Sequence, residues 1–304
     1  MSWGLERADG QGRECFKARP KLPRSKPTRL ALIATLAAGI AGCMGAAHAG
    51  QPTPPFSSAA LIAAGPVADA HVAATATGKD TQGSGAPLWA GIRIDLKDGW
   101  KTYWRNPGNA GIAASFDWSG SINLRSASIV WPAPDLFFDG YAHSIGYHSP
   151  GVVLPVRIVP ENPERPVALA LRLDYAVCKD ICVPERAELA GFVRSAPGAA
   201  DEVRAINAAL AQVPKTASEM PSAVLTPDGA VDVRFAGETV DHVFAVQIDG
   251  RPLLVPEAAD DPSRYRLSLM GVPDDDRKAG LPIHLTWITP GAAYEAVVRL
   301  TTAR

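Results

Sequence analysis

Residues 89–109 read WAGIRIDLKDGWKTYWRNPGN and indicate how this part of the chain folds. In the first half, apolar residues alternate with charged ones, which is the period-two pattern of a β-strand with one buried face. An Asp-Gly pair at 98–99 marks a turn, and the aromatic run Trp100–Trp104 predicts a second strand. Arg105–Asn109 has strong turn chemistry and predicts a loop. The stretch therefore predicts short strands separated by turns.

Similar short strand signals recur on both sides of this stretch. The candidate strands are residues 128–131, 152–159, 167–175, 187–193, 231–235, 243–248, 265–269, 283–288 and 294–300. Gly and Pro, 27 of each, are spread along the chain and supply the turns between them. Many short strands with intervening turns are typical of antiparallel sandwiches, so the sequence predicts an all-β fold.

One segment has helical periodicity instead. Apolar residues recur at positions 203, 206, 210 and 213, with Asp201 placed to cap the start and Pro214 to stop the helix. We expect this helix to connect two β domains. The predicted organisation is a signal peptide (1–49), a flexible, Pro-rich lead-in (50–69), a β-sandwich (70–198), a helical linker (199–215) and a second, smaller β-sandwich domain (216–304).

Length and composition are those of a globular chain of about two domains. The 304 residues are 47% hydrophobic and 20% charged. Residues 1–49 hold eight of the 30 basic residues and three of the 31 acidic ones, which leaves a net charge of −6 on the remainder. A mildly acidic body argues against binding to nucleic acid, which requires a basic face.

The amino terminus has the three parts of an export signal. Residues 17–29 are basic and lack acids, Leu30–Ala41 is apolar, and Ala47–Ala49 is a small-x-small cleavage pattern. The apolar run is shorter than the roughly 20 residues of a membrane span. Ile40–Cys43 also resembles a lipobox, in which Cys43 would be acylated. We therefore expect a periplasmic protein, with lipid anchoring in the envelope through Cys43 as the alternative.

Cleavage after Ala49 would leave two cysteines, Cys178 and Cys182. An exported protein meets an oxidising compartment, so this pair can form a disulfide. A five-residue loop contributes only about 2 kcal/mol in the chain-entropy model, which is little for a structural staple. Short loops can instead strain the bond and make it easier to reduce. Lys179 would favour a thiolate and Asp180 would oppose it, so spacing alone leaves redox and structural roles open.

Five segments around the pair occur in a recognisable order: Asp98–Gly108, Trp131–Pro134, Ser144–Tyr147, Val153–Val156 and Tyr175–Glu185. Together they make the stretch 88–192 resemble the amino-terminal periplasmic domain of the DsbD family of protein-disulfide reductases, above all the branch that includes the ScsB proteins. The resemblance implies an immunoglobulin-like β-sandwich with the cysteine pair at one end. It makes the first domain a DsbD-like redox sandwich.

The resemblance also implies an activity, that of a thiol:disulfide oxidoreductase. In this family the domain takes electrons from a membrane-embedded reductase domain and gives them to periplasmic thiol proteins such as thioredoxin-like clients. Cys182 would exchange with the partner and Cys178 would resolve the mixed disulfide. Full-length members continue into transmembrane helices and a thioredoxin-like domain, which this sequence does not show, so we expect a separate membrane partner.

Family members shield the pair with an aromatic cap loop until a partner docks. The corresponding residues here are Phe137, Phe138, Asp139 and Tyr141, and Tyr103 falls where the family has an aromatic near the pair. Taken one by one, Phe137, Phe138 and Tyr141 are equally compatible with an ordinary core. Tyr103 fits a core residue better than a site residue, and Asp139 fits a turn residue better. The family's bacterial prototype has a longer gap between its cysteines, so the cap geometry can differ.

Two other function classes remain open at this point. One is a non-catalytic binding or scaffold protein whose disulfide is structural. The other is a copper-handling protein, because thiolates suit Cu(I), although the four Met and six His are not clustered. A zinc site is not expected, because one cysteine pair without a nearby His or second pair leaves the tetrahedron unfilled. His143 and His148 near the cap are interpreted as structural or solvated, and no metal or cofactor is expected.

Overall fold

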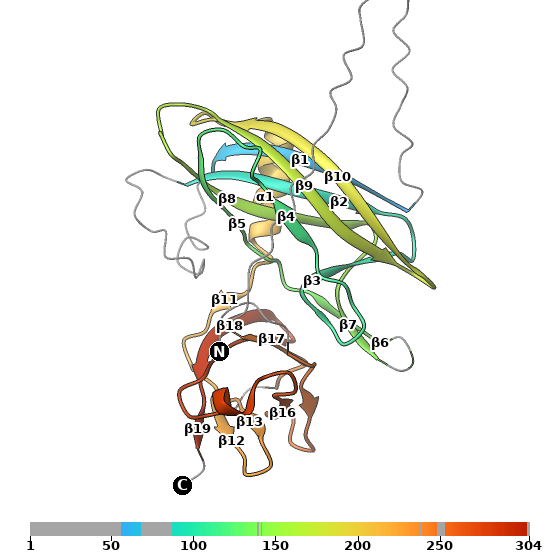
Figure 1. The fold of residues 1–304 in the computed structure, drawn as a ribbon, viewed down its shortest axis with the longest axis vertical. Coiled ribbons are helices and arrows are strands. Elements are labelled where there is room, and N and C mark those ends of the chain that lie inside the picture. The colour runs from blue at the N-terminus through green and yellow to red at the C-terminus, as the bar shows by residue number, and fades with distance from the viewer. Residues whose placement is uncertain are drawn as a thin grey trace, which may run out of the picture. The chain divides into compact units, whose positions relative to one another are not determined.

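The computed structural model describes residues 56–67, 87–138, 140, 142–237, 239–247 and 253–302. The expected export signal, with its cleavage pattern and Cys43, lies outside the described residues. The described part consists mainly of β-strands with one α-helix (Figure 1). This confirms the predicted all-β class with a short connecting helix.

The first sandwich has two antiparallel sheets. One has the order β1 (Ser57–Pro66), β2 (Leu88–Leu96), β8 (Gly151–Pro160), β5 (Leu124–Ile129). The other has the order β10 (Cys182–Val193), β9 (Val167–Cys178), β3 (Lys101–Gly108), β7 (His143–His148), β6 (Asp135–Phe138), with β4 (Ser115–Asp117) also on β9. Apolar residues of both sheets, such as Ile92 and Leu171, form the core between them. This is the predicted immunoglobulin-like sandwich.

The predicted flexible lead-in is wrong for residues 57–66, because they form β1. This strand pairs antiparallel with β2 from Ser57 opposite Leu96 to Pro66 opposite Leu88. Its sequence, SSAALIAAGP, is rich in small residues and gives only a weak strand signal. Pairing with β2 and burial of Ile62 decide its conformation.

The predicted loop at Arg105–Asn109 is also corrected, because β3 continues to Gly108. β3 pairs with β7 up to Tyr103 and again at Gly108, with a shift in register between them. Pro107 has no N–H to donate to a ladder, and Gly108 has a φ of +80°. The turn-forming residues thus make an irregular strand instead of a loop.

The predicted helix is present as α1 (Ala200–Leu210). It packs Ile206 and Leu210 into a small core with Trp89 of β2. The expected cap is wrong: Ala199 is the N-cap and no side chain caps the helix. Asp201 lies in the first turn, where a negative charge suits the helix dipole.

The second β unit is also a sandwich of two sheets. One has the order β11 (Lys215–Thr216), β18 (Ala292–Arg299), β17 (Pro282–Thr289), β14 (His242–Gln247). The other has the order β15 (Glu257–Ala258), β16 (Arg264–Ser268), β13 (Ala230–Arg234), β12 (Ser222–Leu225), β19 (Thr301–Thr302). A short 3₁₀ helix, η2 (Asp274–Asp276), follows β16. Both sheets contribute to one apolar core, which confirms the predicted second β-sandwich.

The irregular end of β3 contacts this second sandwich. The Trp104 ring lies 5.6 Å from that of Phe244, and the Arg105 guanidinium lies 3.2 Å from the carboxylate of Glu295. The Asn106 side chain is 0% exposed and donates hydrogen bonds to the carbonyl oxygens of Ala245 (2.7 Å) and Leu253 (3.0 Å). These buried polar contacts bind the two sandwiches to each other through β3.

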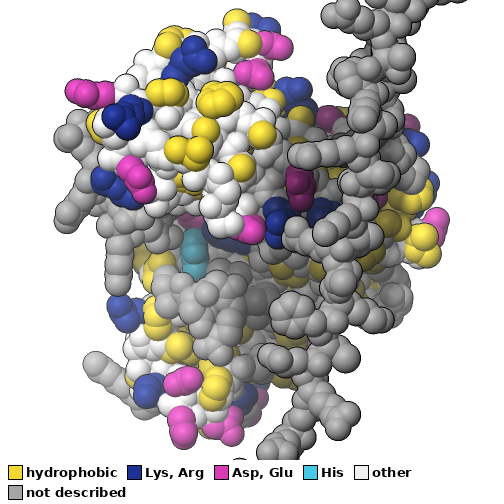
Figure 2. Space-filling view, turned by 45° about the horizontal axis from the view of Figure 1, so that its top comes forward, with side chains coloured by type: hydrophobic (Ala, Val, Ile, Leu, Met, Phe, Trp, Pro, Cys, Tyr) yellow, Lys and Arg dark blue, Asp and Glu magenta, His cyan; other side chains and the backbone are white. Residues whose placement is uncertain are grey.

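The surface shows mixed charge. On the face in Figure 2, basic and acidic side chains of the described residues are interspersed. No helix in the described ranges is long and apolar enough to cross a membrane.

Candidate redox site

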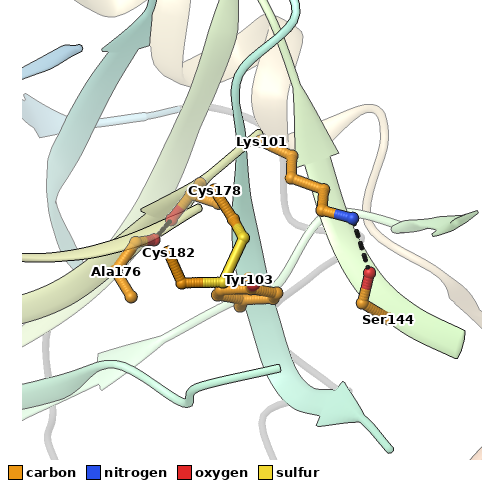
Figure 3. Close-up of a disulfide and its surroundings, with 7 residues drawn as sticks. Lys101, Tyr103, Ser144, Ala176, Cys178 and Cys182 are labelled. Atoms are coloured by element: carbon orange, nitrogen blue, oxygen red, sulfur yellow. Dashed lines mark hydrogen bonds between the residues drawn. A yellow bond between two sulfur atoms is a disulfide. The ribbon is translucent and has the colours of Figure 1, made fainter. Parts of the chain in front are cut away.

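The two cysteines close a β-hairpin. β9 ends at Cys178, β10 begins at Cys182, and the two residues are directly paired in the register between these strands. They form a disulfide with a Cα–Cα distance of 4.1 Å (Figure 3). In the turn between them, the backbone N–H of Lys179 donates to the carbonyl of Ile181. The pair therefore lies at the tip of two long, well-paired strands.

The two cysteines differ in exposure. Cys178 is 7% exposed and packs with Tyr103 and Ala176, whereas Cys182 is exposed. Their places in the sheet explain the difference: β9 is flanked by β3 on its other side, while β10 is the edge strand. An incoming thiolate must reach a disulfide sulfur directly, so Cys182 is the accessible residue for exchange.

Tyr103 lies at the disulfide, as the resemblance implies. Its hydroxyl is 3.3 Å from Sγ of Cys182, although the side chain is otherwise buried (Figure 3). A hydroxyl at this distance can donate a hydrogen bond to a thiolate on Cys182 and so favour its charged form. Tyr103 is thus both a core residue and a contact of the sulfur.

Sequence reasoning missed Lys101. On β3 it lies directly opposite Cys178 of β9, and it is only 8% exposed. Its ammonium group donates to Oγ of Ser144 at 3.0 Å and lies 5.1 Å from the ring centre of Phe137 (Figure 3). The available signal was a lysine inside an aromatic strand pattern, in Trp100–Trp104. Only the strand order shows that it lies beside the cysteine.

The residues expected to form the cap lie on and after β6. Phe137 is half-buried, and its ring also lies 6.4 Å from that of His148. Phe138 is 64% exposed, and its ring centre lies 5.1 Å from that of His143. The other two expected cap residues, Asp139 and Tyr141, lie outside the described residues. Phe137 thus contacts Lys101 on β3, the strand that lies beside the cysteine pair.

The remaining charges near the pair are more exposed. Lys179 and Asp180 are exposed in the turn, and the Lys179 ammonium extends over Gly99. Burial raises the pKa of Glu185 on β10. Nδ1 of the exposed His148 lies 2.8 Å from a carboxylate oxygen of Asp135. Among the described residues, no three His, Cys, Asp or Glu side chains are grouped to hold a metal.

The fold and this site define a class: an immunoglobulin-like sandwich with a hairpin disulfide, one cysteine buried and the other exposed. Residues 69–193 match the family model described as "Thiol:disulfide interchange protein DsbD, N-terminal". This match agrees with the resemblance seen in the sequence. The family is one of thiol–disulfide exchange.

Comparison with solved structures supports the fold. The N-terminal periplasmic domain of ScsB from Proteus mirabilis aligns with a TM-score of 0.60 and 18% identity, over 83% of this chain and 96% of that one. The CupB2 chaperone of Pseudomonas aeruginosa aligns with a TM-score of only 0.19 and 13% identity, over 70% of this chain and 93% of that one. Comparison with curated protein sequences gave no match.

Proposed function

We propose that this protein is a periplasmic thiol:disulfide oxidoreductase that relays electrons from a membrane-embedded disulfide reductase to a periplasmic thiol protein through Cys178 and Cys182. The observation that carries the proposal is the unequal exposure of the two cysteines. A relay needs one sulfur that partners can reach and a second, protected sulfur that resolves the intermediate. The family match over residues 69–193 supports the same chemistry.

The donating half-reaction starts from the reduced pair. The Cys182 thiolate attacks a disulfide of the client, and one client sulfur leaves with the electron pair and takes up a proton. Cys178, as a thiolate, then attacks Sγ of Cys182 in the mixed disulfide, and the second client sulfur leaves as a thiolate and is protonated. The client gains two electrons and two protons, and the pair becomes a disulfide.

The loading half-reaction runs in the opposite direction. A thiolate of the membrane reductase attacks Sγ of Cys182, and Cys178 leaves as a thiolate and is protonated. The second thiol of the reductase then attacks its own mixed-disulfide sulfur, which closes the disulfide of the reductase and frees Cys182. The membrane dithiol is thereby the reductant, and no cofactor of this chain takes part.

A relay that meets many thiols also needs protection between partners. We propose that Phe137, Phe138, Asp139 and Tyr141 form this shield, supported by the half-buried position of Phe137 beside Lys101. Location in the periplasm is part of the proposal and is supported by the export-signal pattern in residues 17–49. The lipid anchor at Cys43 remains its alternative.

Trapping the intermediate tests the proposal. Cys178→Ser should leave the mixed disulfide at Cys182 unresolved, so a client-linked species accumulates that is visible on a non-reducing gel and is released by dithiothreitol. The matched control is Cys182→Ser, which retains only the buried cysteine and should trap little. If mild dithiol cannot reduce the native pair, or if both variants trap equally, the relay is wrong. A structural disulfide in a binding or scaffold protein would then explain the chain.

A further inference from the structure

We infer that Lys101 stabilises the thiolate of the buried Cys178 whenever the disulfide is open, and so allows Cys178 to leave and to attack at neutral pH. This inference rests on the proposed relay, because only a cycling pair needs a reactive Cys178. It assigns to β3 a function that neither the cysteine spacing nor the cap predicts.

The buried cysteine poses a chemical problem for a relay. Cys178 is enclosed by Tyr103 and Ala176, and burial in apolar surroundings raises the pKa of a thiol. At neutral pH such a thiol is mostly protonated, so it is both a slow nucleophile and a poor leaving group. Both half-reactions pass through a Cys178 thiolate, and a nearby positive charge would lower the free energy of forming it.

Lys101 is placed to supply that charge. It is the direct partner of Cys178 in the register between β3 and β9. Directly opposed residues in an antiparallel pair have Cβ atoms about 4.5–5.5 Å apart on the same face of the sheet. The side chain is 8% exposed, so solvent and salt screen its charge much less than that of a surface lysine.

The Lys101 side chain is also flexible enough to respond to the redox state. In the disulfide form its ammonium group is directed to Oγ of Ser144, and Figure 3 shows it directed away from the sulfur atoms. A lysine has a flexible four-carbon stem and a compact charge, so a short rotation can redirect it. When the bond opens, the negative charge appears on Sγ of Cys178, on the side of the hairpin next to β3.

The other charged or titratable groups around the pair are less well placed. Lys179 and Asp180 are exposed in the turn, so their opposite charges are screened. Glu185 lies further along β10, and the exposed His148–Asp135 pair lies on β7 and β6. The Tyr103 hydroxyl contacts the other sulfur, that of Cys182. Among the described residues, Lys101 is the buried cation adjacent to Cys178.

The test measures the acidity of each thiol directly. The chain, with Cys15→Ser and Cys43→Ser so that only the pair reports, is labelled with ¹³C at the cysteine Cβ, reduced and titrated by NMR. Lys101→Met should raise the pKa of Cys178 by about one unit, a tenfold loss of thiolate at neutral pH. The matched control, Lys179→Met, removes the same charge next to Cys178 in sequence and should shift it by less than half as much.

Charge is separated from packing by two further variants. Lys101→Arg should keep the wild-type pKa of the Cys178 thiol, and Lys101→Gln should raise this pKa as Lys101→Met does. If the Met variant does not fold, the comparison of the Arg and Gln variants tests the inference instead. The inference is overturned if removing the Lys101 charge leaves the pKa of Cys178 unchanged, or if Lys179→Met has the same effect. Because the pair can be reduced in the unfolded chain before refolding, this result is independent of whether the native disulfide cycles.

Discussion

Substitution of Asn106 tests how firmly β3 is bound to the second sandwich. In Asn106→Ala the chain loses two hydrogen bonds to the carbonyls of Ala245 and Leu253, and a third in which the backbone N–H of Gly108 donates to Oδ1 at 3.0 Å. All three lie at a fully buried side chain. At about 1 kcal/mol net for each bond, the free energy of unfolding should fall by about 3 kcal/mol.

A second substitution at the same position separates donor from acceptor. Asn106→Asp keeps the acceptor for Gly108 but replaces both donated bonds by a carboxylate that faces two carbonyl oxygens. A buried charge without a partner costs more than a lost hydrogen bond, so Asp should destabilise at least as much as Ala at pH 7. Destabilisation by Asp should weaken at acid pH, where protonation removes the charge.

Guanidinium unfolding followed by tryptophan fluorescence measures these changes. The control is Asn207→Ala on α1, whose buried Oδ1 accepts no hydrogen bond, so the loss should stay below about 1 kcal/mol. If Asn106→Ala costs no more than this control, the contacts of β3 with the second sandwich do not hold the two together. The reasoning from buried polar pairing would then be refuted.

Two further predictions follow from the site and from the contact between the sandwiches. Tyr103→Phe removes the hydroxyl next to Sγ of Cys182 and should raise the pKa of that thiol by about half a unit to one unit, measured from the pH dependence of iodoacetamide alkylation and contradicted by an unchanged profile. Burial by itself would raise the pKa of Glu295, but hydrogen bonds and charge from His284 and Arg105 lower it below its ordinary value of 4.5. The ionised Glu295 therefore contributes its full stabilisation above pH 4.5, the ordinary pKa. This contribution is lost as the pH falls through the lowered pKa of the folded state. Glu295→Gln should remove this part of the acid sensitivity of the melting temperature, and parallel curves for wild type and variant would refute it.

Sequence patterning succeeded where burial alternates strictly. Strands such as β13 and β16 have one buried and one polar face, and their period-two signal is local. The cysteine pair was found for a similar reason, because both members lie at the adjoining ends of one hairpin. The resemblance to the DsbD family then supplied Tyr103, whose contact with Cys182 no spacing rule could have shown.

The misses share a different cause, which is that tertiary pairing overrides local preference. β1 has few strand-forming residues, and it is a strand because its backbone pairs with the free edge of β2. Residues 105–108 have turn chemistry but continue β3, because the Asn106 side chain has partners in the second sandwich. Lys101 could not be assigned to the site because its neighbour in space, Cys178, is far away in the sequence.

The last two of these misses both lie in β3. Its first residues, Lys101 and Tyr103, lie against the cysteine pair, and its later residues, Arg105 and Asn106, are bound to the second sandwich. Tyr103 and Arg105 are only two residues apart along this strand. Contacts made at one end of β3 therefore help to fix the position of the lysine and the tyrosine at the other end. The second sandwich therefore binds the same strand whose first residues lie against the cysteine pair.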